Sequence, residues 1–403
     1  MSTSILYHGW GIRGYQYSGT EYEGGAMTFV IRQEDWTLRC RACGSGRVIR
    51  SGQFVRQFKS LPIGLTPVLI RLAIPRVECR DCGAIRQVKV AFADERRRYT
   101  HALERYAVDL CRVMTIADVA FHLQLSWDIV KDIHKRYLGR RFARPKLKKL
   151  RRMAIDEISI GRGQRYLTVV LNLDTGAVVF VAKGRSAETL QPFWRRLRGS
   201  GAKVRAVATD MSPAYIGAVE SHLPKAKLVF DRFHVVKLFN EKLSDLRRQV
   251  QSGAEGMARQ VLKCTRWLLL KNPENLDDER NERQRLADAL MLNQPLATAY
   301  YLKEDLRQFW EQPDKQSARR FLADWIARAT ASGVQMLVKF ARTLTAHRDG
   351  LLAWYDHPIS TGPLEGTNNK IKTLQRRAYG YRDQEYFTLR IYGLHETTYA
   401  LVG

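Results

Sequence analysis

The sequence contains no apolar run that approaches the roughly 18 residues needed to cross a membrane. Its first residues also lack the charged and then apolar layout of a signal peptide, so we expect a cytoplasmic protein with no membrane partner. Acidic residues are scarce, because 40 Asp and Glu stand against 67 Lys and Arg, which gives a net charge of +27. The positive charge is clustered, which favours a polyanionic partner over the alternative of a merely basic protein.

Cysteine is scarce too, and the six that occur in this chain favour metal binding or free thiols over disulfides. Four of them form two CxxC pairs: Cys40, Cys43, Cys79 and Cys82. The residues between the pairs alternate as strands do, and Gly44 and Gly83 follow the pairs where a tight turn is needed. A β-hairpin would join the pairs into one structural Zn²⁺ site, and four unliganded buried cysteines are the alternative. We expect residues 1–95 to form this β-rich zinc-ribbon domain.

A helix-turn-helix is predicted within residues 96–140. Thr115 is placed to cap a short helix, a turn follows, and Ser126 is placed to cap a second helix. The second helix could enter a DNA major groove, although many helical hairpins bind nothing. Its candidate DNA-binding residues are Ser126, Trp127, Lys131 and Lys135.

A basic linker is predicted at residues 141–152, because eight Lys or Arg occur within residues 139–152 and Pro145 breaks any helix there. It would lie along a phosphate backbone, and an inert, solvated run of charge is the alternative. The candidate DNA-binding residues in and beside it are Arg140, Arg141, Lys146, Lys148 and Lys149.

The remaining residues predict an α/β core with an all-helical insertion. Apolar patterning predicts the order βββαβαβα from residue 153, which is the ribonuclease-H-like arrangement. We expect its first part at 153–234, a helical insertion at 235–350 and its final part at 351–403. Most tryptophans of the insertion should be core residues, although one exposed aromatic could insert into unstacked DNA.

Three carboxylates lie on separate elements of this core. Asp156 lies within the first strand, Asp210 ends the fourth, and Glu365 opens a late helix. Carboxylates so placed can hold two Mg²⁺ ions, with Mn²⁺ as a substitute, for phosphodiester chemistry. Glu157 should point to the opposite face of its strand and is excluded. For any single acid the alternative is a surface charge.

Asp231 and His234 form a second candidate catalytic pair, because residues three apart at the start of a helix share a face. A buried structural pair is the alternative. Further candidate DNA-binding residues follow Glu365 on the late helix: Asn368, Asn369, Lys370, Lys372, Arg376 and Arg377.

These motifs together resemble the DDE transposases of bacterial insertion sequences, specifically the ISL3 family. The resemblance covers nearly the whole chain and also includes segments 61–64, 209–212, 365–372 and 380–382. It implies a nucleoid-associated enzyme that binds terminal inverted repeats, cleaves DNA with the help of metal ions and joins the ends to target DNA. Because two ends must be joined in concert, we expect a homodimer. The alternatives are a DNA-binding regulator with a non-catalytic scaffold and a nuclease that cuts without joining.

Overall fold

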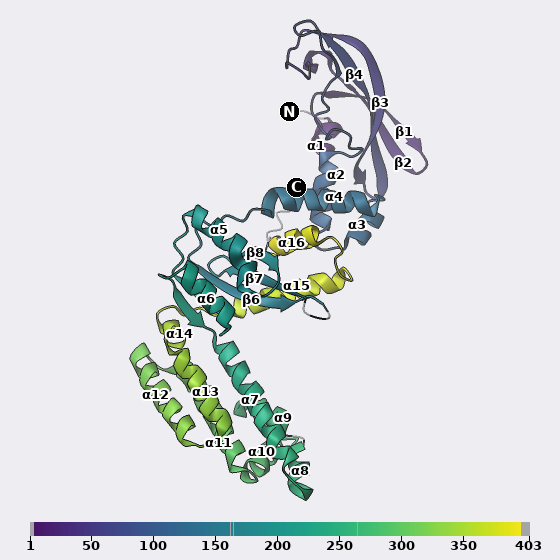
Figure 1. Cartoon of the computed structure of the whole chain (residues 1–403). Coiled ribbons are helices and arrows are strands. Elements are labelled where there is room, and N and C mark those ends of the chain that lie inside the picture. Colours follow the sequence, from purple (N-terminus) through teal and green to yellow (C-terminus); the bar gives the residue numbers. More distant parts are fainter. Residues whose placement is uncertain (1–3, 162, 164, 264, 396–403) are drawn as a thin grey trace. The chain divides into compact units, whose positions relative to one another are not determined.

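A computed structural model describes residues 4–161, 163, 165–263 and 265–395, and the chain divides into two units, Met1–Arg141 and Phe142–Gly403 (Figure 1). Each unit has its own cores of buried apolar side chains. No helix in the described ranges is both long and apolar enough to span a membrane.

The first unit begins with a five-stranded mixed sheet in the order β1-β2-β4-β3, with β5 beside β4. Its strands are β1 (Tyr15–Glu23), β2 (Ala26–Gln33), β3 (Val48–Ile63), β4 (Thr66–Cys79) and β5 (Ile85–Gln87). Helix α1 (Ile5–Trp10) and the 3₁₀ turn η1 (Asp35–Thr37) accompany them. The long antiparallel hairpin of β3 and β4 joins the two CxxC pairs, since Val48 is registered with Cys79.

Three helices complete the first unit: α2 (His101–Leu110), α3 (Ile116–His122) and α4 (Trp127–Phe142). The Thr115 side chain and Asp118 form a reciprocal capping box at the start of α3. The N–H of Ile129 donates to the Ser126 hydroxyl at the start of α4. Both caps are those that the sequence predicts, and between them Gln124 adopts a left-handed φ of 48°.

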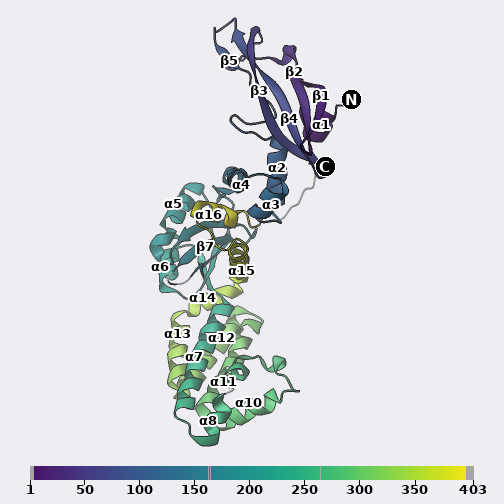
Figure 2. The same cartoon turned by 90° about the vertical axis from the view of Figure 1, so that its right-hand side faces the viewer.

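The second unit is built on a sheet in the order β10-β9-β6-β7-β8. Figure 2 shows helices on both sides of β7. Its strands are β6 (Arg152–Ser159), β7 (Tyr166–Asn172), β8 (Val178–Lys183), β9 (Ala206–Thr209) and β10 (Lys227–Phe230). Strands β6, β7 and β8 are antiparallel neighbours, whereas β9 and β10 run parallel to β6. The five strands follow one another along the chain as the sequence predicts, because each is a short apolar run bounded by turn signals.

Helices cover both faces of that sheet. The four helices are α5 (Gln191–Ser200), α6 (Pro213–His222), α15 (Gly362–Arg377) and α16 (Gln384–Tyr392), and the 3₁₀ turn η2 (Ala187–Leu190) precedes α5. One core cluster packs α5 and α6 against the side chains of Ile155 and Val207. The other packs α15 and α16 against those of Ala154 and Ala208, so residues two positions further along each strand share the α15 face.

A helical insertion separates β10 from α15. Its helices are α7 (Arg232–Ser252), α8 (Gly256–Lys263), α9 (Arg266–Leu270), α10 (Glu282–Met291), α11 (Gln294–Arg307), α12 (Lys315–Ala331), α13 (Gln335–Ala346) and α14 (Arg348–Leu352), with 3₁₀ turns η3 (Pro273–Asn275), η4 (Gln308–Glu311) and η5 (Ala353–Tyr355). Trp310 and Trp325 lie in its core, whereas Trp267 is 66% exposed.

Gly350 of α14 lies against the Phe230 ring, where an added Cβ would be only 2.3 Å from a ring carbon. A glycine is therefore required where the insertion returns to β10.

The basic linker is anchored at its apolar residues. Between α4 and β6 the chain has no regular helix or strand, and Leu147 and Leu150 are buried against the face of the sheet that α5 and α6 cover. Lys146, Lys148 and Lys149 are exposed. The Arg196 guanidinium donates to the Pro145 carbonyl oxygen at 2.9 Å. The alternation of leucine and lysine therefore holds these lysines toward solvent along a fixed path.

Candidate active site

Parallel pairing of β6 and β9 brings two of the predicted acids to the same level of the sheet. Ala154 is registered with Ala208, so Asp156 and Asp210 each lie two residues beyond this pair, on the face covered by α15. Asp210 follows the last residue of β9, and its Oδ1 accepts a hydrogen bond from the Ser212 N–H at 3.1 Å. Their side chains therefore belong to one acidic patch.

The Asp156 carboxylate is held by two donors. Asn368 of α15 donates from Nδ2 to Oδ2 at 2.9 Å, and the Glu157 N–H donates to Oδ1 at 2.8 Å. Burial, with a smaller contribution from the charges of Glu157 and Asp210, raises the pKa of Asp156 to about 6, although His234 and the Glu157 N–H act in the opposite direction. At neutral pH this site thus holds a carboxylate whose negative charge is poorly compensated.

Glu157 faces the other side of the sheet, as the sequence predicts. Tyr215 of α6, a core residue on that face, lies close enough to lower the pKa of the Glu157 carboxyl. Burial raises the pKa of Glu157, and the nearby Asp210 raises it further. Glu157 therefore adds negative charge close to Asp156 without sharing its face.

Asp231 is engaged in structural hydrogen bonds at both carboxylate oxygens. It is 4% exposed and caps α7, where Oδ1 accepts from the Phe233 N–H at 3.2 Å. Oδ2 accepts from the Thr361 N–H at 3.0 Å and from the Thr361 hydroxyl. The first helix of the insertion is thus tied to the residue that precedes α15. His234, in the first turn of α7, is half-buried and lies close enough to Asp156 to lower the pKa of that carboxyl.

Replacing Asp231 by alanine should therefore loosen the start of α15. Loss of a helix cap and of hydrogen bonds to a buried carboxylate should lower the free energy of unfolding by about 2–4 kcal/mol. For a unit of this size, that corresponds to a fall of about 5–15 °C in melting temperature, which calorimetry can measure. Asp314→Ala is the matched control, because Asp314 caps the exposed start of α12 through Ser317. An equal loss in both variants would contradict the proposed tie.

Glu365 lies in the first turn of α15 and is exposed to solvent. It precedes Asn368 by three residues, so the two side chains are neighbours on the helix surface. Asn368, which the sequence places among the DNA-binding residues, is instead 7% exposed and bonded to Asp156. In the described ranges no set of three carboxylates has oxygen atoms within 4.8 Å of one another, so the three acids do not form a tight cluster.

The residues around Asp156 fit a divalent cation. Carboxylates and an amide oxygen are the hard ligands that Mg²⁺ and Mn²⁺ prefer. The Asn368 Oδ1 atom is buried and has no partner in the described part of the chain. A cation would relieve both the crowded negative charge and this unsatisfied oxygen.

The four CxxC cysteines form a second candidate metal site, in the first unit. Their sulfur atoms all lie within 4.8 Å of one another, with 3.7 Å between Cys40 and Cys82 and 3.5 Å between Cys43 and Cys79. Tetrahedral zinc with bonds of about 2.3 Å needs sulfur atoms about 3.8 Å apart. Gly44 and Gly83 turn the two CxxC segments at φ values of 78° and 69°, and backbone donors, chiefly at Cys43, lower the pKa of Cys40 to about 7. The cluster could therefore hold zinc.

Of the predicted DNA-binding residues in the first unit, some are exposed and others already make contacts within the protein. Trp127 is exposed, and the Lys131 ammonium lies 5.2 Å from its ring centroid. The Ser126 hydroxyl is used as a helix cap. Lys135 is partly buried, and Arg140 lies 3.3 Å from the Glu104 carboxylate. Arg140 therefore also holds α4 against α2.

Comparison with known proteins gives consistent matches. A family model described as "Transposase" (DDE_Tnp_ISL3) matches residues 153–391, and one described as "Helix-turn-helix domain of transposase family ISL3" matches residues 88–138. The transposase for insertion sequence element IS1001 of Bordetella parapertussis is 34% identical over 390 residues, which cover 95% of each chain. The transposase for insertion sequence element IS1557 of Mycobacterium tuberculosis is 30% identical over 90% of this chain and 87% of that protein. The Drosophila P element transposase strand transfer complex is similar at a TM-score of 0.39 and 13% identity, covering 74% of this chain and 92% of that chain.

Proposed function

Because the chain belongs to the ISL3 family of transposases, we propose that it cleaves DNA at the terminal inverted repeats of its element and joins the ends to target DNA in a reaction that depends on divalent cations. The observation that carries this proposal is the half-buried, poorly compensated Asp156 carboxylate, which is level with Asp210 and hydrogen-bonded to the helix that bears Glu365.

Asp156, Asp210 and Glu365 are the proposed cation ligands. Two bound Mg²⁺ ions would supply an activated oxygen nucleophile and a stabilised leaving oxygen. The Asn368 amide orients the Asp156 carboxylate, and Asp231 fixes the start of α15 through Thr361. His234 is proposed to bind the scissile phosphate, because it is half-buried and lies close to Asp156. Asp231 then acts as a positioning residue.

One assay separates the possible activities. Labelled duplexes that carry the terminal inverted repeats flanking the gene would be mixed with the protein, Mg²⁺ and a supercoiled target plasmid. Joined products are the expected result. Binding without cleavage would instead indicate a regulator, and nicking without joined products would indicate a nuclease. Since both ends are joined in concert, the active species is proposed to be a homodimer, which the size of the protein–DNA complex would test.

The first unit is proposed to hold one structural zinc ion and to recognise the ends. One zinc per chain should be found by elemental analysis of the purified protein. Cys40→Ser should lose the metal and weaken end-specific binding, since ligand loss removes folding free energy from the site. Unfolding of the second unit should be unchanged. The control is Cys111→Ala, a buried core cysteine that should keep the zinc. Purified protein without zinc would contradict this assignment.

The basic linker is proposed to follow the phosphate backbone. Replacing Lys146, Lys148 and Lys149 with alanine should weaken binding to all sequences alike. The slope of log affinity against log salt should become shallower by up to about three units, because each phosphate contact releases counterions. The charge-matched control replaces three exposed residues of α12 and α13: Arg319, Lys339 and Arg342. If the control changed the salt slope equally, the effect would come from net charge in general, and the linker would have no special role in binding phosphate.

A further inference from the structure

The loop between α15 and α16 holds an aromatic side chain fully in solvent. Tyr379 is 101% exposed and has a φ of 50°, a left-handed conformation that a bulky side chain rarely adopts. The loop is not loose, because the N–H of Tyr379 donates to the Arg376 carbonyl and that of Gly380 to the Gln375 carbonyl. A strained, fixed backbone that presents a bare ring to water is typical of a functional position.

The next residues anchor this loop to α16. The Tyr381 ring stacks on the buried Phe387 ring, with centroids 4.6 Å apart and an interplanar angle of 20°. The Gln384 amide donates to the Tyr381 carbonyl oxygen at 2.9 Å. Tyr379 is therefore held by a rigid support on its C-terminal side as well.

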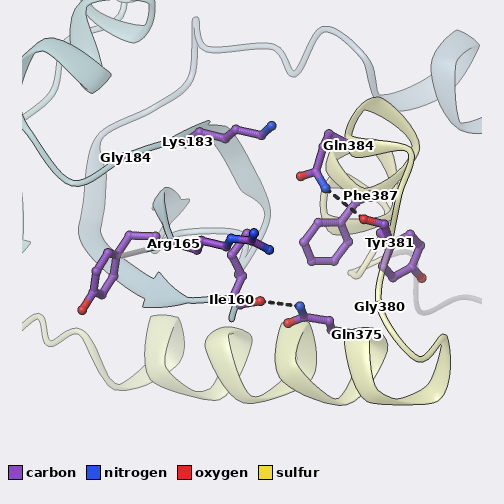
Figure 3. A pocket seen from close by; sticks show the side chains of 10 residues that line it. Ile160, Arg165, Lys183, Gly184, Gln375, Gly380, Tyr381, Gln384 and Phe387 are labelled. Atoms are coloured by element: carbon purple, nitrogen blue, oxygen red, sulfur yellow. Dashed lines mark hydrogen bonds between the residues drawn. The ribbon is translucent and has the colours of Figure 1, made fainter. Parts of the chain in front are cut away.

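A cavity of about 470 Å³ opens beside the loop, and Gly380 forms part of its wall. Figure 3 shows Arg165, which precedes β7, and Lys183, the last residue of β8, opposite Gln384 and Phe387 of α16. None of the described lining residues is acidic. The cavity thus combines cations for a phosphate with amides for base edges, within the size range of small-molecule sites.

A row of exposed residues leads along α15 from the candidate active site to this loop. Asn369, Lys372 and Arg376 follow Glu365 at the spacing i+4, i+7 and i+11, which places them on one side of the helix. From Glu365 to Arg376 the helix rises roughly 16 Å. That length corresponds to about five nucleotide steps at about 3.4 Å each.

We propose that Tyr379 inserts between base steps of the bound DNA, about five nucleotides from the cut, and that the neighbouring cavity receives the displaced nucleotide. This inference rests on the proposed function. Tyr379 replaces the stacking of the displaced base, while Arg165 and Lys183 bind its phosphate. The reacting phosphodiester is then held at a fixed distance from a distorted step.

The insertion can be detected without cleavage. Terminal-repeat duplexes would carry 2-aminopurine singly at each position within about ten nucleotides of the cut, on either strand, since that base brightens when it leaves the stack. In the absence of divalent cations, binding should brighten one position severalfold, about five steps from the cut. If the responding position lies in a target duplex rather than in the element end, the displaced nucleotide belongs to the target. No response at any position in either duplex would overturn the proposal.

Substitutions at Tyr379 distinguish the contribution of its ring to DNA distortion from its contribution to the stability of the fold. Tyr379→Gly relieves the left-handed strain, so its melting temperature should be equal or higher, yet the fluorescence rise should vanish. Tyr379→Trp should keep the rise, and Tyr301→Ala, which removes an exposed tyrosine of α11, should have no effect. An abasic nucleotide at the responding position should restore cleavage by Tyr379→Gly. A rise that persists in the glycine variant would overturn the proposal.

The cavity is tested by access to the displaced base. Acrylamide should quench the displaced 2-aminopurine weakly in the parent and strongly in an Arg165→Gln, Lys183→Gln double variant. Lys339→Gln, which removes an exposed lysine of α13, is the control. Equal quenching in the parent and the double variant would contradict the cavity. A parent that joins ends without any fluorescence rise overturns this inference alone, whereas a parent that never cuts overturns the proposed function as well.

Discussion

Asp156→Asn should abolish strand cleavage and yet, in buffer without divalent cations, make the protein more resistant to heat. Burial raises the pKa of Asp156 from the ordinary 3.8 to about 6. A shift of about two units corresponds to a penalty on the order of 3 kcal/mol for the ionised group above that pH. Asparagine keeps the shape and carries no charge. Its oxygen can still accept from the Glu157 N–H, and its NH2 group can donate to the otherwise unsatisfied Asn368 oxygen if that amide turns over.

The gain in stability should depend on pH. The folded-state pKa of this acid lies above its unfolded value, so the protonated form favours folding. That stabilising contribution is complete below about pH 4 and is lost as the pH rises through about 6. The melting temperatures of the parent and the variant should therefore converge near pH 4 and differ most above pH 7, which calorimetry across this range would show.

Added Mg²⁺ should reverse the order of the two melting temperatures, so that the parent becomes more resistant to heat than Asp156→Asn. Cations that bind only the folded parent raise its melting temperature in proportion to their occupancy, whereas the variant has lost a ligand and should respond little. Cleavage should fall by about 10³-fold or more, because removing a metal ligand removes several kcal/mol of transition-state stabilisation. Glu157→Gln is the matched control, since it also removes a half-buried charge but on the other face. The Glu157→Gln control should still cleave DNA. An Asp156→Asn variant that still cleaves would disprove the assignment of Asp156 as a metal ligand.

Local patterns predicted much of this structure. The turns at Gly44 and Gly83, the caps at Thr115 and Ser126, and the strands of the α/β core each depend on neighbouring residues or on short-range alternation. The alternation also separated Asp156 from Glu157, because successive side chains on a strand point to opposite faces.

Contacts between distant segments were not predictable in the same way. The bond between Asn368 and Asp156 joins positions 212 apart, and that between Asp231 and Thr361 joins positions 130 apart. Nothing in the local sequence distinguishes a buried asparagine that orients a carboxylate from an exposed one that binds DNA. The spacing of three residues from Glu365 was the one available signal. Asp231 was likewise grouped with His234 by spacing, although its oxygens serve Phe233 and Thr361.

Glu365→Gln should also reduce cleavage by about 10³-fold or more in Mg²⁺, but with the opposite effect on stability. Glu365 is exposed in the first turn of α15, where a negative charge interacts favourably with the helix dipole. Removing that charge should therefore cost about 0.3–1 kcal/mol of folding free energy, whereas Asp156→Asn should increase it. Binding to the terminal repeats should be unchanged or tighter, because a negative charge near phosphate is gone.

The matched control for this variant is Glu385→Gln, which removes an exposed glutamate from the first turn of α16. It should cleave as the parent does. Glu365→Asp keeps the charge but shortens the side chain by one methylene, so it should be strongly impaired if reach matters as well as charge. Cleavage rates and end binding would be measured on the same labelled duplexes. A glutamine variant that cuts at nearly the parent rate would show that Glu365 is not a metal ligand and that the assignment of the three acids is wrong.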